Sequence, residues 1–176
     1  ESTNNITISW VNKHATVVPN NVFKPELTSS ILNACFEKEI SKNDIDYNRI
    51  FNLALVNVFE VPLWLKSFFV VRYPRVKLQH LNTHLFLSLT QFKSISSQVV
   101  CIVYPESLIV IETLKGQLNF CNNYDITTEE DVLYYLAFVL QQQGVNNKRA
   151  LTISISNLVD FTSEQKLNDA LKNIVF

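Results

Sequence analysis

The stretch that decides the fold is VVCIVYPESLIVIETLKGQLNFCN, residues 99–122. It contains three apolar segments, at 99–104, 108–112 and 117–122, and each has the length and composition of a strand. Two short turn sequences, Pro105-Glu106 and Lys115-Gly116, separate the segments. Because turns of this length join antiparallel neighbours, the sequence predicts a three-stranded meander.

A helix is expected directly after the meander. Thr127 and Glu130 have the spacing of a capping box, and Asp131 adds negative charge to the first turn. The helix body, residues 132–140, is apolar on nearly every side, which predicts burial between two layers or two domains. Gly144 is expected to end this helix in a left-handed cap. A strictly alternating strand at 151–156 and a last helix from Ser163 complete the second half.

The first half is predicted to alternate between strands and helices. Strands are expected at 6–10, 53–61 and 76–80, and helices at 25–36, 62–72 and 81–92. A loop with Pro19 and Asn20 follows the first strand, and a polar stretch at 42–46 follows the first helix. A small polar linker at 94–97 places the boundary between the halves, which are therefore residues 1–97 and 98–176.

This order of elements indicates a fold class. The second half reads βββαβα, and the first half matches that order if two leading strands lie upstream of Glu1. A meander followed by alternating helices and strands is the order of a ribonuclease H-like unit, and two such units in tandem make an actin-like ATPase fold. We therefore expect an α/β protein with mixed sheets, N-terminally incomplete in its first half.

Composition excludes several classes of function. The 176 residues include two glycines, Gly116 and Gly144, so no Walker loop, dinucleotide fingerprint or nucleophile elbow can be written from them. The formal net charge of -1 argues against nucleic acid or a membrane surface as a partner. No apolar stretch is long enough to span a bilayer, and no signal-peptide pattern opens the chain. Cys35, Cys101 and Cys121 each lie among apolar residues, as reduced core thiols do, which predicts the cytoplasm.

From Trp10 to its C-terminus the chain resembles the bacterial family called domain of unknown function 3822. The resemblance is carried by Val17-Val18-Pro19, Val22-Phe23, the run from Asn57 to Pro62, His80, Thr83 and, above all, the run from Asn122 to Tyr135. It implies an actin-like ATPase fold, further strands before Glu1, and a strand and helix after Phe176. No biochemical activity is established for the family, so the resemblance implies a fold and little more.

The sequence departs from the nucleotide chemistry of that fold. Actin-like ATPases hold phosphate with hairpins of the form Asp-x-Gly, because backbone N–H groups must approach the phosphate and Asp must orient magnesium-bound water. The corresponding turn here is Tyr104-Pro105-Glu106-Ser107, with no Gly and with a Pro that removes a donor. The glycine pair that cups adenosine is replaced by Ser156-Asn157. We interpret this as a phosphate site lost from the second half.

Three groups of residues are candidates for a metal or catalytic site, and each also has a structural interpretation. His80 and His84 are four apart but lack a nearby third ligand, so a structural His80 with satisfied ring nitrogens is preferred over a metal site. Glu129, Glu130 and Asp131 could join Asp160 in a two-metal nuclease site, although helix capping explains these acids more simply and the strand at 99–104 has no Asp. Cys101 and Cys121 have no His at short spacing, which argues against catalytic thiols.

Three further groups are candidates for binding. Lys66, Arg72, Arg75 and Lys77 form the best basic cluster, with a solvated helix rim as the preferred interpretation. Tyr134, Tyr135 and Phe138 are interpreted as packing between the domains rather than as a ligand platform. The strand edge at Thr152, Ser154 and Ser156 could accept a partner strand or be covered.

The sequence thus predicts a non-catalytic binding or scaffold protein with a degenerate nucleotide site. No catalytic, metal or cofactor-binding residue is assigned, and no cofactor is expected. The expected partner is a protein, including a second copy of the chain. The alternatives are a nucleotide-binding actin-like protein that holds ATP between its halves without turnover and, behind it, a metal-dependent nuclease.

Overall fold

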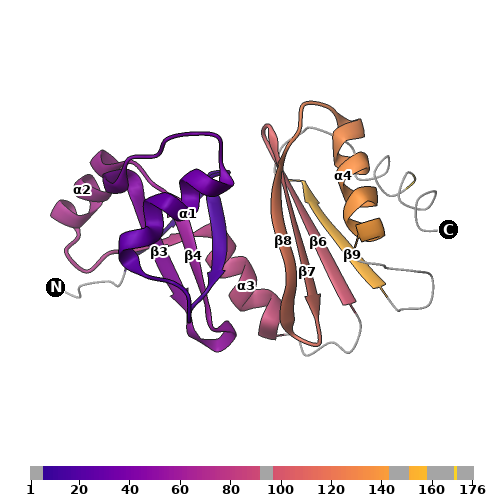
Figure 1. The fold of residues 1–176 in the computed structure, drawn as a ribbon, viewed down its shortest axis with the longest axis horizontal. Coiled ribbons are helices and arrows are strands. Elements are labelled where there is room, and N and C mark those ends of the chain that lie inside the picture. The colour runs from indigo at the N-terminus through magenta and orange to yellow at the C-terminus, as the bar shows by residue number, and fades with distance from the viewer. Residues whose placement is uncertain (1–5, 92–96, 143–150, 158–168, 170–176) are drawn as a thin grey trace. The chain divides into compact units, whose positions relative to one another are not determined.

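The structure is a computed structural model, and it describes residues 6–91, 97–142, 151–157 and 169 (Figure 1). It shows a mixed α/β protein, whose chain divides into two compact units, residues 1–88 and 89–176. The domain boundary expected after residue 97 stays a prediction. Gly144, Asp160, the helix expected from Ser163 and most of the linker at 94–97 lie outside the described residues.

The second unit contains the predicted meander. Its elements are β6 (Ser97–Tyr104), β7 (Ser107–Leu114), β8 (Gln117–Asp125), α4 (Glu129–Gln142) and β9 (Leu151–Asn157). The strands form one sheet in the order β8-β7-β6-β9, in which β9 runs parallel to β6 and the other pairs are antiparallel. The meander and the strand after α4 are therefore confirmed.

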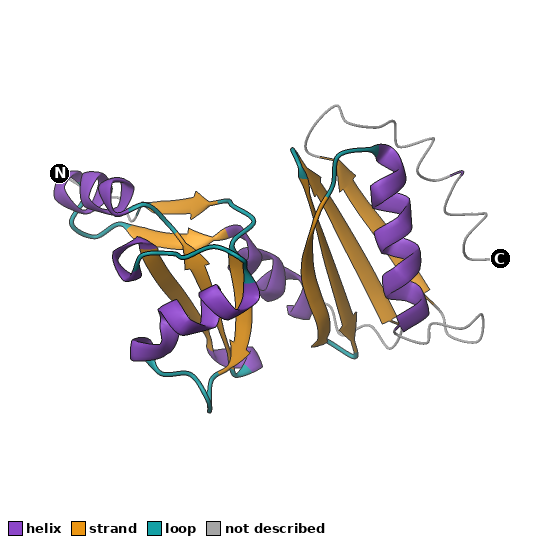
Figure 2. Cartoon of the chain, turned by 45° about the horizontal axis from the view of Figure 1, so that its top comes forward, coloured by secondary structure: helices purple, strands orange, loops and turns teal. Residues whose placement is uncertain are grey.

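Helix α4 lies across one face of this sheet (Figure 2). Val132, Leu136 and Val139 are fully buried against apolar side chains of β6 and β7, among them Cys101 and Val110. Burying side chains of this size contributes roughly 1.5–3 kcal/mol each. The helix is thus held by one apolar stripe of ordinary helical spacing.

The prediction that α4 is buried on nearly every side is wrong. Tyr134 is 64% exposed and Phe138 is 37% exposed, so these two rings do not form core. Tyr135 packs against the core and stacks on Tyr124, with 4.3 Å between the ring centroids. The apolar composition of the helix did not distinguish exposed from buried rings, because among the described residues α4 packs on the sheet through one face.

The first unit holds two small sheets. Its strands are β1 (Thr7–Trp10), β2 (Ala15–Pro19), β3 (Ile45–Ile50), β4 (Leu55–Glu60) and β5 (Lys77–His80). Its α-helices are α1 (Thr28–Cys35), α2 (Leu63–Arg72) and α3 (Leu81–Gln91), with single 3-10 turns η1 (Pro25–Leu27), η2 (Lys42–Asp44) and η3 (Phe51–Leu53). Strands β1 and β5 pair in parallel, and β2-β4-β3 form an antiparallel sheet.

Two of these strands differ from the predicted order. The predictions of β1, β4, β5 and the three helices are confirmed. Strand β2 falls where a loop was expected, and β3 begins in the expected polar stretch at 42–46 and continues into residues for which no element was predicted. Both form because they flank the buried central strand β4, as in the pairs Val17–Asn57 and Asn48–Asn57. Pairing with β4 gives hydrogen-bond partners to backbone N–H and C=O groups of these two segments.

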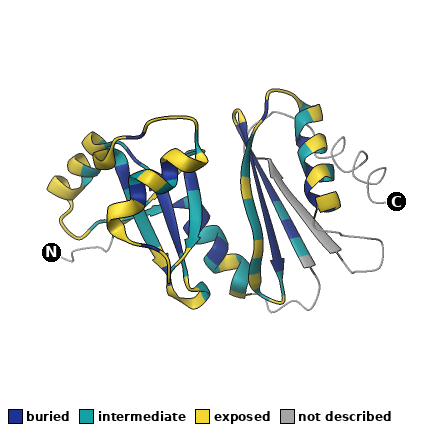
Figure 3. Ribbon diagram, in the orientation of Figure 1, coloured by how far each residue is buried: buried dark blue, intermediate teal, exposed yellow. Residues whose placement is uncertain are grey.

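The core of the first unit lies around β4 (Figure 3). Val56 and Val58 pack with Leu32 of α1 and Phe23, and Phe59 packs on the other side of the strand with Ala15 and Val61. All of these side chains are buried, in agreement with the predicted buried strand. In the described part of the chain, no helix combines the length and apolar character needed to cross a membrane.

Candidate functional site

The turn between β6 and β7 lies where a phosphate-binding hairpin was considered. Tyr104 and Ser107 pair across it, and Pro105 and Glu106 are its central residues. Pro105 has no N–H to offer, and Glu106 adopts a left-handed φ of 61°, a conformation that favours glycine. The Glu106 carbonyl accepts a hydrogen bond from the Ile126 N–H at 3.2 Å. The turn is therefore tied back to its own unit and offers few backbone donors to an anion.

The register of the sheet brings the second altered position beside this turn. Ser156 and Asn157, which were expected at the place of the adenosine-side glycines, end β9 opposite Ile102 and Val103 of β6. The carboxyl ends of two parallel strands thus meet at one edge, the usual position of ligand sites in α/β proteins. Next to the turn, Tyr104 is 9% exposed, and burial raises the pKa of its hydroxyl to about 12.

Of the acidic residues at the start of α4, Asp131 serves as a helix cap. The Asp131 carboxylate accepts hydrogen bonds from the backbone N–H of Thr127 at 2.7 Å and of Thr128 at 2.8 Å, and from the Thr127 hydroxyl at 3.0 Å. These hydrogen bonds lower the pKa of Asp131, and the bond from the Thr127 N–H has the largest effect. The capping pair is Thr128 with Asp131, so the predicted pair Thr127 with Glu130 is wrong by one residue. In the described part of the chain, no three His, Cys, Asp or Glu side chains gather as a metal site.

His80, a candidate from the sequence, is a structural residue. It is fully buried at the end of β5, where its Nδ1 accepts the Asn82 N–H at 3.2 Å. Because Nδ1 is the acceptor, the neutral ring carries its proton on Nε2, which donates to the Asn12 carbonyl oxygen at 3.2 Å. Burial lowers the pKa of His80 to about 4. The preferred interpretation, a histidine with satisfied ring nitrogens, is confirmed, and His84 lies on the following helix.

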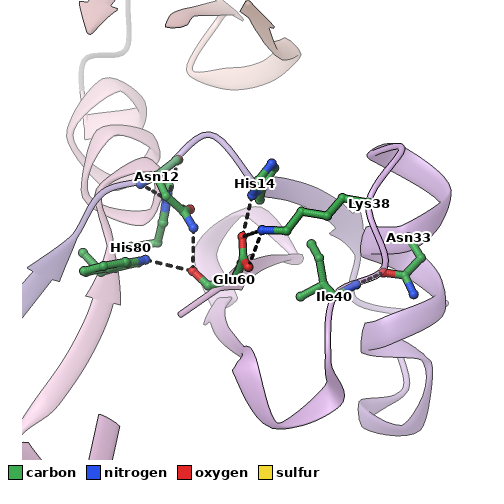
Figure 4. Close-up of polar contacts among 8 residues, drawn as sticks. Asn12, His14, Asn33, Lys38, Ile40, Glu60 and His80 are labelled. Atoms are coloured by element: carbon green, nitrogen blue, oxygen red, sulfur yellow. Dashed lines mark hydrogen bonds and ion pairs between the residues drawn. The ribbon is translucent and has the colours of Figure 1, made fainter. Parts of the chain in front are cut away.

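A polar cluster around Glu60 was missed at the level of sequence (Figure 4). The Glu60 carboxylate pairs with His14 and, at 2.8 Å, with the Lys38 ammonium. Its main-chain oxygen accepts hydrogen bonds from Trp10 Nε1 and Asn12 Nδ2, both at 2.8 Å. Burial raises the pKa of Glu60, but the hydrogen bonds from Lys38 and His14 outweigh that effect and lower it.

A second network joins the two sheets of the first unit. Asn57 donates to the Thr83 hydroxyl at 3.1 Å, and that hydroxyl donates to Asn48 Oδ1 at 3.1 Å. The same oxygen accepts the His80 N–H at 2.9 Å, and Asn48 Nδ2 donates to the Leu78 carbonyl at 3.1 Å. Asn57, Glu60, His80 and Thr83 are among the residues that carry the family resemblance, and the structure gathers them around two adjoining networks. Asn57 and Thr83 are 26 residues apart in the chain, so no local sequence pattern predicts their contact.

The three cysteines differ in how far they are buried. Cys101 is buried and Cys121 is half-buried, and burial raises the pKa of each thiol to about 12. Cys35 is exposed, so the prediction that it lies in the core is wrong.

The residues of the basic cluster lie on and after helix α2. Lys66 and Arg72 are in α2, and Arg75 and Lys77 follow it in the chain. A cavity of about 210 Å³ lies beneath α2, lined by Asp46, Tyr47, Asn48, Lys66, Phe69, Val70, Val76 and Leu78.

The fold has a counterpart among solved structures. A crystal structure from Bacteroides thetaiotaomicron VPI-5482, a protein with actin-like ATPase fold and unknown function, matches with a TM-score of 0.84 at 21% identity. The match covers 97% of this chain and 65% of that chain, so this chain spans less than two thirds of its length. The chain therefore has an actin-like ATPase fold, as the order of elements predicted.

The sequence identifies the family. The model of the family described as protein of unknown function (DUF3822) matches residues 2–173, and the chain belongs to this family. The cytoplasmic domain of EpsL, an inner membrane component of the type II secretion system of Vibrio cholerae, matches at 14% identity over 90% of this chain and 69% of that one, with a TM-score of 0.32. No curated protein matches the sequence.

Proposed function

We propose that this protein is a non-catalytic binding or scaffold protein, built on an actin-like fold whose second unit has lost its phosphate loop. The carrying observation is the turn after β6, where Pro105 lacks an N–H and Glu106 occupies a left-handed position. A phosphate loop needs several backbone N–H groups converging on one point, and glycine lets the backbone come close enough. This turn instead carries the acidic side chain of Glu106, which disfavours an anion.

The proposal extends to partner and location. The expected partner is a protein, and a second copy of the chain is the first case to test, by sedimentation of the purified protein. A nucleic acid partner is not proposed, since the formal net charge is -1. A cytoplasmic location is supported by three free thiols, of which Cys101 lies in the apolar core of the second unit.

The experiment that tests the proposal is a thermal-shift titration with ATP and magnesium, together with an ATP hydrolysis assay on the full-length protein. We expect no rise in Tm at millimolar ATP and no hydrolysis above the background of buffer. A ligand at one hundred times its Kd would stabilise the folded state by about 2.7 kcal/mol, so binding would be seen as a clear shift. A saturable shift would favour the nucleotide-binding alternative, and turnover would overturn the proposal.

A further inference from the structure

Helix α2 exposes a continuous row of large apolar side chains. In this helix of 10 residues none is buried, and Figure 3 draws it in the colours of exposed and intermediate residues. Trp64, Phe68 and Val71 are 70%, 54% and 83% exposed. Their spacing of four and three residues places them in one stripe along the helix. Leu63 and Val70 form a second exposed stripe beside it. The largest contiguous apolar patch of a protein surface is often a binding site.

The opposite side of α2 explains how the helix is held. Leu65 packs against the cluster of Ala15, Phe59 and Val61, and Phe69 lines the cavity beneath the helix. The Lys66 ammonium donates to the Ile45 carbonyl oxygen at 2.8 Å. These contacts lie on the side away from Trp64, Phe68 and Val71, so the exposed stripe is not needed to attach α2 to its own unit.

Cations gather at one end of the apolar stripe. Arg72 ends α2, and Arg75 and Lys77 follow it in exposed positions. From 61 to 105 the sequence contains no Asp or Glu, in a chain whose formal net charge is -1. Two carboxylates near the N-terminal end of α2 accept hydrogen bonds from backbone N–H groups. Asp44 accepts the Leu63 N–H at 2.7 Å, and Asp46 accepts the Tyr47 N–H at 2.8 Å.

We propose that α2 is a peripheral membrane-binding helix, whose stripe of Trp64, Phe68 and Val71 enters the interface of an anionic lipid bilayer. A helix that carries Trp and Phe on one face with Lys or Arg at its edge has the chemistry of an interfacial helix. Arg72 and Lys77 contact the anionic headgroups, which adds electrostatic attraction that salt weakens. This inference goes beyond the proposed function and does not depend on the ATP measurements. The expectation of no membrane partner rested on the net charge of the whole chain, which averages out this local excess.

A second copy of the chain fits this face less well. A helix of 10 residues is about 15 Å long and 10–12 Å across, so its exposed half offers a few hundred Å² at most. A stable interface buries about 800 Å² on each partner. Two copies that met through α2 in a parallel orientation would also bring their Arg72 side chains together. A bilayer needs neither a large area nor an opposing set of charges on a second protein.

The test is flotation of the protein with vesicles of phosphatidylcholine alone and of phosphatidylcholine with about 30% phosphatidylserine. We expect binding to the anionic vesicles at low salt, weak binding to the neutral ones, and loss of binding in high salt. Trp64 emission shifts to the blue on binding, and W64F loses that shift. The variant F68S/V71S lowers the vesicle affinity at least tenfold, and R72Q/K77Q lowers it roughly tenfold or more.

Matched variants separate the α2 stripe from general hydrophobicity and charge. Phe51 is 82% exposed on η3 and Lys24 is exposed before η1, so F51S and K24Q are the controls and keep wild-type affinity. Circular dichroism and Tm confirm that each variant is folded. The proposal is overturned by an absence of binding to anionic vesicles or by equal losses in F51S and F68S/V71S. It is also overturned if α2 variants abolish a dimer instead of vesicle binding, or if this chain binds vesicles and the full-length protein does not.

Discussion

Thr128 and Asp131 cap the N-terminus of α4 reciprocally. The Asp131 N–H donates to the Thr128 hydroxyl at 3.3 Å, and the Asp131 carboxylate accepts the Thr128 N–H at 2.8 Å. This is the capping-box arrangement, in which two backbone donors at a helix start are satisfied by two side chains. The pair fixes the residue at which α4 begins, and hence which of its side chains face the sheet.

The first prediction concerns this cap. T128A lowers the free energy of unfolding by about 1 kcal/mol, because the Asp131 N–H loses its acceptor at the helix start. T127A removes a hydroxyl that donates to Asp131 but does not cap the helix, and is expected to have a smaller effect. Urea unfolding of the two variants measures the difference. A larger effect for T127A would show that the helix starts one residue earlier.

The second prediction is the pH dependence at the same site. The folded state lowers the pKa of Asp131, so the ionised carboxylate contributes stability that is present above the ordinary pKa of about 3.9 and is lost as pH falls through the folded value. D131N therefore has a lower Tm than wild type at pH 7, and the gap narrows in strong acid. E130Q is the matched control on the next residue. Thermal melts from pH 7 to pH 2 measure both, and a constant gap would contradict the prediction.

A third prediction follows from the buried His80. Its pKa falls from 6.5 to about 4 in the folded state, so the unfolded chain binds more protons between these values. Stability is fully present above pH 6.5 and decreases by roughly 3 kcal/mol as the pH falls towards 4. H80Q removes this part of the pH dependence of the free energy of unfolding, whatever the variant's stability at pH 7. Urea unfolding at half-unit pH steps provides the comparison, and parallel curves for wild type and H80Q would refute it.

The fourth prediction concerns the ion pairs of Glu60. The Lys38 side chain is 50% exposed, so its pair with Glu60 contributes little, and K38M is expected to change the free energy of unfolding by less than about 1 kcal/mol. E60Q is more damaging, because the half-buried His14 and Lys38 both lose their acceptor charge. A double-mutant cycle with K38M, E60Q and the pair isolates the coupling. A coupling well above 1 kcal/mol would mean that the cluster is screened from water more than its exposure indicates.

The fifth prediction concerns the turn after β6. E106G stabilises the protein by roughly 0.5–1 kcal/mol, since glycine adopts the positive φ of 61° without the strain that a Cβ brings. E106A keeps the Cβ and serves as the control, with no gain expected. The same variants do not acquire ATP binding, because Pro105 still lacks an N–H. Calorimetry measures the first effect, and the thermal-shift titration with ATP measures the second.

The second unit was predicted well because its signals are local. Strand β7 is buried at every position but its last, and the apolar run at its centre, residues 108–111, is visible in the sequence. The turn at Lys115 and Gly116, with φ values of 53° and 74°, has the two positive φ angles that a two-residue hairpin prefers and that Gly tolerates. The same local reasoning was one residue out at the α4 cap, since Thr127 and Thr128 differ only in where the helix begins.

The sequence by itself determined the mixed α/β class, the meander, the existence of helix α4 and the missing glycines at the expected phosphate turn. These depend on periodicity and on residue types within a short window. Only the tertiary structure decided that Ala15–Pro19 and Ile45–Ile50 are strands, that Asn57 and Thr83 meet, and that Trp64 and Tyr134 are exposed while Leu65 packs inward. Strand pairing and side-chain burial join residues far apart in the chain, and their free energy exists only once the partner segments are in place.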